Sequence, residues 1–349
     1  MSSHNWLHLA TQDWLDGHRL ESLLTTFGSV AAVCDADPGA LLAAGLNPDQ
    51  CRKLTQPVDE QLRHAADWAA TDGNQVLAWT DPDYPALLRE IPDPPPVLFV
   101  RGRAELLARP QLAIVGSRRA TAGGRSNAGR FAGELAAGGF VITSGLAAGI
   151  DTAAHEGTLK AGGETIAVCG TGLDEVYPPA NRQLAERIAA EGALISEYAP
   201  GCGPLPFRFP RRNRVISGLA AGTLVIEAGW RSGALITARL AGLHGREVFA
   251  LPGSIHNPMS RGCHRLIRQG AKLVENTADV VDELGGLLAA MLPSIKQNAA
   301  SGSDHEPAAS EPSHTLLQDM GWDPVSIDEL VSRSGLTAAE VSSMLMTLE

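Results

Sequence analysis

The chain lacks paired cysteines, long apolar runs and a leader pattern, and each absence excludes a class of protein. Its 5 cysteines are odd in number and include no Cys-x-x-Cys pair, which excludes a disulfide framework and a zinc site of paired cysteines. No stretch reaches the ~18 consecutive apolar residues that a membrane helix needs. The N-terminus has no basic start followed by an apolar run, so we expect no signal peptide. We therefore expect a cytoplasmic protein that does not enter a membrane.

Apolar residues are plentiful, which excludes a disordered or fibrous chain. Hydrophobic residues make up 44% of the sequence and charged residues 19%, so there is enough apolar surface for a buried core. A length of 349 residues is enough for roughly two to three domains.

The net charge of −11 is distributed unevenly along the chain. Residues 1–107 carry 7 Lys and Arg against 15 Asp and Glu, residues 108–285 carry 19 against 15, and residues 286–349 carry 2 against 9. Because binding depends on local potential, the basic middle segment can hold a polyanion although the whole chain is acidic. The acidic flanks would then screen this segment from wrong partners.

Residues 1–78 show the apolar spacing of several short helices separated by turn residues. The part LLTTFGSVAAVCDADPGALLAAGL is similar to a helix-hairpin-helix or SAM-like module, and a small helical cap fits the same pattern equally well. The proline-rich stretch 79–100 ends in the strand-like VLFV and is expected to be a wrapped connection.

From residue 112 the pattern changes to short runs rich in Val and Ile, alternating with helical segments. Strands without polar alternation are buried on both faces, as in parallel sheets. The regular alternation predicts an α/β fold with a doubly wound, Rossmann-like parallel sheet over residues 79–285.

The end of the chain differs in composition from this middle segment. Residues 286–313 are predicted to be a flexible linker, from their Ser, Ala, Pro and Gly content. Residues 314–349 then predict a helix-turn-helix, with a turn at Gly335 and a second helix capped by Thr337 and Glu340. Because no β-hairpin follows, we expect an incomplete, winged-helix-like fragment.

Several predicted strands end in small residues, among them Gly116-Ser117, Ser144-Gly145 and Gly170-Thr171-Gly172. In an open parallel sheet, ligands bind beyond the carboxyl ends of the strands. Glycines there let a ligand approach the backbone, and helix N-termini offer N–H groups to phosphate. Each turn taken alone also fits a purely structural role, but together they predict a phosphate-lined crevice. Ser232 and Thr237, near the start of a later helix, would bind a further phosphate or cap that helix.

Arginine is the main chemical feature of this crevice. The chain has neither a GxxxxGK[ST] nor a GxGxxG motif, so we expect no nucleotide cofactor. Arg118 and Arg119 follow the first strand, and LPFRFPRRNR holds four arginines interleaved with Phe207 and Phe209. Guanidinium groups match phosphate oxygens and aromatic rings stack on unpaired bases, so this segment indicates single-stranded nucleic acid.

A purely structural interpretation of two of these arginines stays open. Arg212 and Arg214 would then form buried ion pairs with Glu197 and Glu227, which lie at neighbouring strand ends.

Catalytic groups are few. Asp151 and His155 lie on one helix face and could hold a metal or act as an acid–base pair. A helix cap by Asp151 and a buried hydrogen bond of His155 explain them more simply, because a metal site needs further ligands. We predict no metal site and no catalytic residue.

At this point several motifs in a fixed order carry a family resemblance: IVGSRRAT, SGLAAGIDTAAHEGTLKAGG, TIAVCGTGLDEVYPPAN and FRFPRRNRVISGLAAGTLVIEA. Over residues 79–285 the chain resembles the DNA-processing protein A (DprA/Smf) family. The resemblance implies a protein without enzymatic activity that binds single-stranded DNA, protects it during natural transformation and loads the RecA recombinase onto it. It also implies a homodimer formed through the Rossmann-like domain.

The resemblance also implies where DNA binds. It assigns contacts to the arginine of the GSR motif, here Arg118, and to a lysine in the helix after SGLA, matched to Lys160. It places the RNR segment in the same pocket. With the turns and arginines above, the expected DNA-binding residues are Gly116, Ser117, Arg118, Arg119, Ser144, Gly145, Lys160, Gly170, Thr171, Gly172, Phe207, Arg211, Arg212, Asn213, Arg214, Ser232 and Thr237.

Two other functions were weighed. A nucleoside-monophosphate phosphoribohydrolase of the lysine-decarboxylase-like (LOG) type has a similar sheet, but it needs a PGGxGT loop, and the matching segment here is TLVIEAGWRSGALIT. A protein-interaction scaffold with a vestigial crevice is the third possibility.

Overall fold

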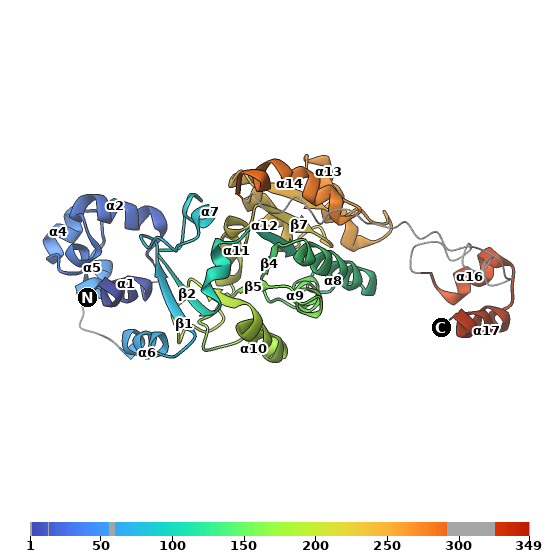
Figure 1. The fold of residues 1–349 in the computed structure, drawn as a ribbon, viewed down its shortest axis with the longest axis horizontal. Helices are drawn as coiled ribbons and strands as arrows, with labels where there is room; N and C mark the ends of the chain where they lie inside the picture. Colours follow the sequence, from blue (N-terminus) through green and yellow to red (C-terminus); the bar gives the residue numbers. More distant parts are fainter. Residues whose placement is uncertain (1, 13, 56–59, 292–324, 349) are drawn as a thin grey trace. The chain divides into compact units, whose positions relative to one another are not determined.

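The computed structural model describes residues 2–12, 14–55, 60–291 and 325–348. The chain divides into two compact units, residues 1–299 and 300–349. In the first unit, a helical N-terminal part precedes a nine-stranded sheet that is covered by helices on both faces (Figure 1). Within the described residues, no helix has the length and apolar character needed to cross a membrane.

The N-terminal part consists of short helices whose starts are set by polar caps. Asp16, Ser29 and Asp37 each accept a backbone N–H in the first turn of a helix, a donor that the helix itself leaves unpaired. The apolar faces of these helices form one core with strand residues such as Phe99. The helices are α1 (Ser2–Ala10), α2 (Gly17–Phe27), α3 (Val30–Cys34), α4 (Pro38–Ala43), α5 (Pro48–Thr55) and α6 (Glu60–Ala69).

The predicted helical part extends to residue 78, and this is wrong for its last residues. Asn74–Ala78 form strand β1, which pairs antiparallel with β2 (Val97–Gly102). Five residues are too few for the apolar period to distinguish a strand from a helix. A short helix, α7 (Ala86–Arg89), lies in the connection between the two strands.

The sheet confirms the predicted doubly wound α/β fold. Its order is β1-β2-β6-β5-β4-β3-β7-β8-β9, and every neighbouring pair from β6 to β9 is parallel. The pairs β1–β2 and β2–β6 are antiparallel, so β2 runs against the other strands and the sheet is mixed at this edge. The remaining strands are β3 (Gln111–Val115), β4 (Val141–Ser144), β5 (Thr165–Val168), β6 (Ala193–Ser196), β7 (Gly222–Val225), β8 (Glu247–Ala250) and β9 (Lys272–Leu273).

Alternate residues of the strands enter two different cores, because successive side chains of a strand point to opposite faces. In β3, Leu112 and Ile114 pack with helices on one face, whereas Ala113 and Val115 pack with helices on the other. The first face is covered by α8 (Ala122–Ala137), α9 (Ile150–Lys160), α10 (Arg182–Glu191) and α14 (Thr277–Met291). The second is covered by α11 (Arg208–Leu219), α12 (Ala234–Leu243) and α13 (Arg261–Arg268).

Helix α11 was not predicted from the sequence. Its buried apolar residues, including Val215 and Ile216, lie in its second half, and its first half is rich in arginine. Pro210 lies in the first turn, where its missing N–H leaves no helical hydrogen bond unmade. The arginine segment is therefore one continuous helix.

The first residues of the predicted linker are helical, since α14 continues past residue 286 to Met291. The rest of the predicted linker and residues 314–324 lie outside the described residues. The second unit contains α16 (Ile327–Ser334) and α17 (Ala338–Leu348), whose contact includes buried Leu330 and Val341. The predicted turn and cap are confirmed: Gly335 has φ 70°, and Glu340 accepts hydrogen bonds from the N–H and hydroxyl of Thr337 at 2.8 and 2.7 Å.

Candidate functional site

A crevice opens where the winding of the sheet reverses, between the carboxyl ends of β3 and β7. Its volume is about 480 Å³. Sequence analysis predicted a crevice at this edge. The residues that line it are Val115, Gly116, Ser117, Arg118, Arg119, Ala147, Asp151, Arg212, Asn213, Ile216, Gly229, Arg231, Ser232, Gly233, Ala234, Thr237 and Met259.

The turn after β3 forms one wall. A Cβ at Gly116 would lie 2.6 Å from Ile150, so only glycine allows this close approach. The hydroxyl of Ser117 accepts the N–H of Arg119 at 3.0 Å, which holds the turn. Arg118 and Arg119 are both exposed, and the guanidinium of Arg118 lies 5.9 Å from the centre of the Phe209 ring.

The start of α12 forms the opposite wall. Ser232, Gly233 and Ala234 line the crevice, and the Ser232 hydroxyl accepts the N–H of Ala234 at 3.3 Å. Arg231 precedes them and is exposed, while Thr237 lies one turn further and is buried. Two cationic side chains on one wall and a third on the other give the crevice a positive lining.

Arg212 and Asp151 form the floor of the crevice, and both are nearly completely buried. Arg212 donates to the carbonyls of Gly145, at 2.8 Å, and of Val168. Asp151 accepts the N–H groups of Gly145 and Ala147 at 3.1 and 3.4 Å. Burial raises the pKa of Asp151 to about 6, against the opposing effect of Arg212. This pair therefore joins the β4 and β5 turns to α11.

The N-terminus of α8 is closed to a phosphate by a side chain of the protein itself. The Glu227 carboxylate accepts the N–H and hydroxyl of Thr121 at 2.9 and 2.6 Å. A carboxylate at a helix N-terminus satisfies the same donors that a bound anion would. Glu227 thus caps α8 and forms no ion pair with Arg212 or Arg214, contrary to the structural interpretation of those arginines.

Ala147 of the turn after β4 lines the crevice, but the predicted phosphate-binding residues of the turns after β4 and β5 do not, contrary to expectation. Ser144 is buried and donates to the Ile114 carbonyl at 2.6 Å. Thr171 donates to the Glu175 carbonyl at 2.8 Å. The residues of these turns, packed below the crevice, are Ser144, Gly145, Gly170, Thr171 and Gly172.

The arginine segment divides between opposite sides of α11. Arg212 and Asn213 line the crevice, whereas Arg214 points away and donates to Glu197 at 2.6 Å and to Asp93 at 2.9 Å. The alternative of a buried ion pair with Glu197 is therefore confirmed for Arg214.

The residues at the start of the segment also lie elsewhere. Arg211 lies 3.8 Å from the same Glu197 carboxylate. Phe207 is 59% exposed and precedes the helix outside the crevice. Neither side chain is among the residues that line the crevice.

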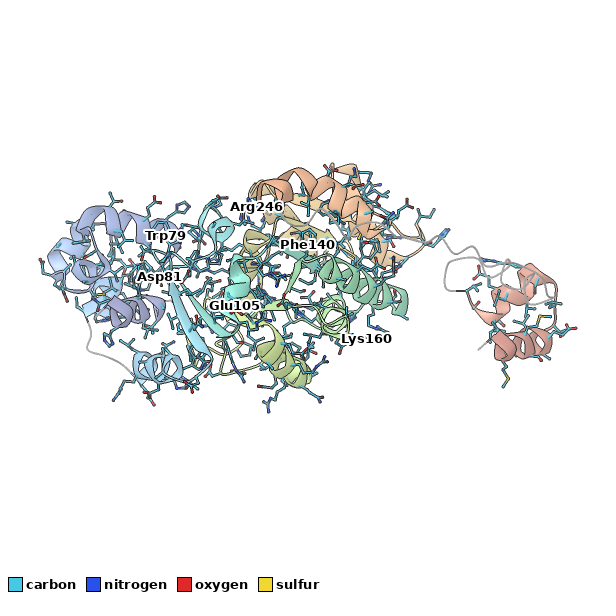
Figure 2. All side chains as sticks on the ribbon, viewed as in Figure 1. Trp79, Asp81, Glu105, Phe140, Lys160 and Arg246 are labelled. Carbon is cyan, nitrogen blue, oxygen red and sulfur yellow. The ribbon has the colours of Figure 1, made fainter. Side chains whose placement is uncertain are left out.

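Lys160 is not among the residues that line the crevice, and its DNA contact stays a prediction. It is the last residue of α9, about 15 Å along the helix from Ile150 at 1.5 Å per residue. The helix begins at the crevice and runs away from it, and Figure 2 shows Lys160 at its far end.

The aromatic pair beside the crevice, Phe209 and Tyr177, was not predicted to be part of the site. Their ring centres lie 5.3 Å apart, and Tyr177 is 45% exposed. A Cβ at Gly170 would lie 2.9 Å from Phe209, so the glycine turn supports this ring rather than a ligand. Nothing in the sequence alone brings Tyr177 to Arg118.

The simpler interpretation is confirmed for His155 and is wrong for Asp151, which does not cap α9 but accepts the N–H groups of Gly145 and Ala147 before the helix. His155 is buried and its Nδ1 lies 2.7 Å from the hydroxyl of Thr165. That hydroxyl donates to the Ile142 carbonyl, so Nδ1 carries the proton. Burial lowers the pKa of His155 to about 3. Across the described part of the chain, no cluster of three His, Cys, Asp or Glu side chains suits a metal ion.

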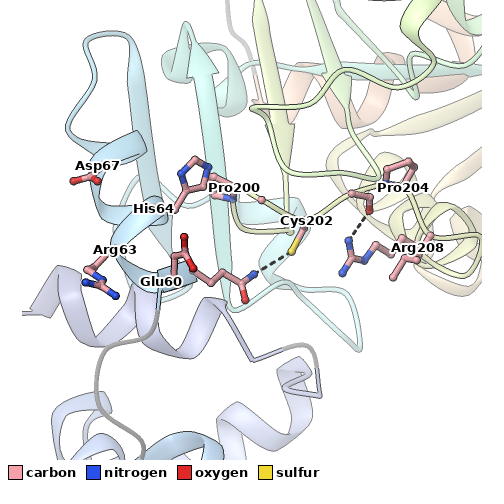
Figure 3. A pocket seen from close by; sticks show the side chains of 12 residues that line it. Glu60, Arg63, His64, Asp67, Pro200, Cys202, Pro204 and Arg208 are labelled. Carbon is pink, nitrogen blue, oxygen red and sulfur yellow. Dashed lines mark hydrogen bonds between the residues drawn. The ribbon is translucent and has the colours of Figure 1, made fainter.

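A larger hollow of about 850 Å³ lies between α6 and the loop after β6 (Figure 3). Gln61 donates to the Cys202 sulfur at 3.3 Å, and His64 lies 3.1 Å from Asp174. Its lining mixes acidic Glu60 and Asp67 with basic side chains. This mixture does not favour a polyanion, so the crevice at β3 and β7 is the better candidate.

Comparison with known proteins identifies the fold and sequence class. The sequence model of the family described as DNA recombination-mediator protein A matches residues 75–285, and that of the DprA winged helix domain matches residues 300–349. Protein Smf of Escherichia coli is 37% identical over 348 residues, covering 97% of this chain and 92% of that protein. The DNA processing protein DprA of Streptococcus pneumoniae is 50% identical over 203 residues, covering 58% and 72%.

Solved structures agree with these relatives. The crystal structure of DprA from Streptococcus pneumoniae has a TM-score of 0.71 and 39% identity, covering 80% of this chain and 97% of that chain. A structure of DNA processing protein A from Helicobacter pylori, described as giving insights into a unique single-stranded DNA binding mode, has a TM-score of 0.56 and 31% identity. It covers 61% of this chain and 96% of that chain.

Proposed function

The chain belongs to the DNA recombination-mediator protein A (DprA) family, and we propose that it binds single-stranded DNA in the crevice between β3 and β7. The observation that carries the proposal is the arrangement of Arg118 against Phe209, with Tyr177 beside that ring. A cation for the phosphate and exposed ring surface for a base then lie on one rim. The single-stranded DNA binding described for the Helicobacter pylori relative supports the same class of ligand.

Arg118, Arg119 and Arg231 supply the charge for this binding. Within the described ranges of the chain, none of them forms an ion pair with a carboxylate, so their charge is available to an incoming polyanion. Contacts to phosphate and to ring faces read no base edges, and we expect little sequence preference.

Around this binding step the protein acts as a recombination mediator without catalysis. It protects incoming single-stranded DNA during natural transformation, loads RecA onto that strand, and works as a homodimer formed through the Rossmann-like domain. Family membership supports these three properties.

The test is fluorescence anisotropy of a labelled single strand across a range of salt, with duplex DNA as competitor. Tight, salt-sensitive binding that duplex fails to displace is the expected result, because phosphate contacts release counterions and unpaired bases are needed for stacking. A RecA-loading assay on the same strand, and sedimentation of the protein, then test the mediator and homodimer steps. Absence of single-strand binding would refute the proposal.

The same preparation tests the enzymatic alternative. Incubation with nucleoside monophosphates should release no base if the protein is not a phosphoribohydrolase. Release of base that depends on Arg118 would instead assign the crevice to that reaction.

A further inference from the structure

A second groove lies beside the crevice, between α12 and α13. Its volume is about 630 Å³, and one stripe of α12 forms a wall, with Leu235, Ala238, Arg239 and Gly242 spaced three to four residues apart. Trp230, Arg231 and Ser232 line it before the start of α12, and Arg265 of α13 and Gln269, directly after that helix, line the other wall.

The groove is basic. Arg231, Arg239 and Arg265 are exposed, and in the part of the chain that the structure describes none of them pairs with a carboxylate. Arg246 is different, because it donates to Glu90 at 3.1 Å and to the Leu87 carbonyl at 3.0 Å. Glu247 is the acidic residue of the lining, so positive charge predominates.

An aromatic platform stands at the entrance. Trp230 is 56% exposed, and the Arg265 guanidinium lies 5.5 Å from the centre of its ring. Large apolar rings are usually covered by other residues, and an exposed one beside cations suits a stacking base. The combination repeats the chemistry of Arg118, which lines the crevice, and the Phe209 ring next to it.

The two hollows are continuous at the start of α12. Arg231 and Ser232 line both the crevice and the groove, so one extended ligand can pass from the first to the second without leaving the surface. We propose that single-stranded DNA held in the crevice continues over Arg231 into this groove, where Trp230 stacks on a base and Arg239 and Arg265 contact phosphates. This inference rests on the proposed function and adds the direction in which the strand leaves the crevice.

The experiment compares oligo(dT) of about 4 and about 16 nucleotides, the range of single-strand sites per module, with the full chain and three variants. Trp230→Ala and Arg265→Ala should weaken binding of the longer strand at least about fivefold and leave the shorter strand unaffected. The matched control is Arg187→Ala, which removes an exposed arginine on the opposite face and should change neither.

A second copy of this chain is the other ligand that such a surface could bind. Sedimentation of each variant, measured beside the titrations, shows whether the substitution has changed self-association. If the Trp230→Ala variant binds the longer strand as tightly as the wild type does, the inference is overturned. The inference is also overturned if a variant binds the longer strand more weakly because it no longer self-associates. Failure of wild type to bind either strand would instead refute the proposed function itself, so the two failures are distinguishable.

Discussion

Arg118 is the side chain on which the crevice depends most directly at the scale of single residues. Replacing it with alanine removes a phosphate partner next to the Phe209 ring. We expect Arg118→Ala to weaken single-strand binding about tenfold, as for a lost hydrogen bond to a charged group. The slope of log affinity against log salt should fall by about 0.7. Anisotropy titrations at several salt concentrations measure both quantities.

Two nearby cations serve as comparisons. Arg125 is exposed in the first turns of α8, donates to the Ala120 carbonyl and does not line the crevice, so Arg125→Ala should keep the wild-type slope. The family resemblance predicts a DNA contact for Lys160, whereas its position at the far end of α9 predicts none in the crevice. A slope that falls in Lys160→Ala but not in Arg118→Ala would reverse our assignment.

His155 makes the folded state sensitive to acid. Burial lowers its pKa from 6.5 to about 3, so below pH 6.5 the unfolded chain takes up a proton that the folded chain refuses. Stability from this residue is therefore lost as pH falls from about 6.5 toward 3. Asp151 acts in the opposite direction, since its raised pKa of about 6 lets the folded state bind a proton first.

The variant His155→Gln isolates the histidine contribution. Between pH 7 and pH 4 the wild type should lose roughly 3 kcal/mol more stability than the variant, from the difference between the two pKa values. Urea unfolding at each pH measures it. Parallel pH profiles of the two proteins would mean that His155 is not held neutral in the folded state.

At the scale of elements, Arg214 attaches α11 to the sheet and to the proline-rich connection. Its side chain and that of Glu197 are 8% and 5% exposed, and they meet at 2.6 Å. Arg214→Ala leaves the buried Glu197 carboxylate with the more distant Arg211, 3.8 Å away, and should cost about 3 kcal/mol of stability. Chemical denaturation measures this loss, and single-strand affinity of the folded variant should stay at the wild-type value because Arg214 does not line the crevice.

A surface ion pair provides the control for that loss. Arg187 and Glu191 lie 3.8 Å apart on α10 and are both about half exposed, so Arg187→Ala should cost less than about 1 kcal/mol. Equal losses in the two variants would show that Glu197 finds another partner or water when Arg214 is removed.

Helix α11 shows why the sequence predicted the position of the crevice better than it predicted which side chains line it. Apolar runs ending in glycine specify parallel strands and the edge where their turns meet, and the turn of Gly116 and Arg118 lies there as expected. The direction of each arginine in α11 depends on partners remote in sequence. Asp93 and Glu197 draw Arg214 to one side, and the carbonyl of Gly145 draws Arg212 to the other. Local pattern carries no information about such partners.

On the scale of the whole molecule, charge is arranged so that a basic domain lies between acidic segments. Residues 286–349 carry 2 basic against 9 acidic side chains, whereas residues 108–285 carry an excess of basic ones. A tethered acidic segment raises the local concentration of negative charge and so competes with a polyanion, with a range set by the Debye length.

This competition leads to a prediction for the chain without residues 300–349, the second compact unit. The shortened chain should bind duplex DNA more tightly than the full chain at low salt, where the Debye length is about 30 Å. The difference should shrink near physiological salt, where that length is about 8 Å. Anisotropy with a labelled duplex at both salt concentrations measures this difference. Among the residues that the structure describes, none beyond residue 300 belongs to the apolar core clusters of the first unit. Weaker duplex binding by the shortened chain would mean that the second unit contributes DNA contacts of its own, and that its acidic charge does not act as a screen.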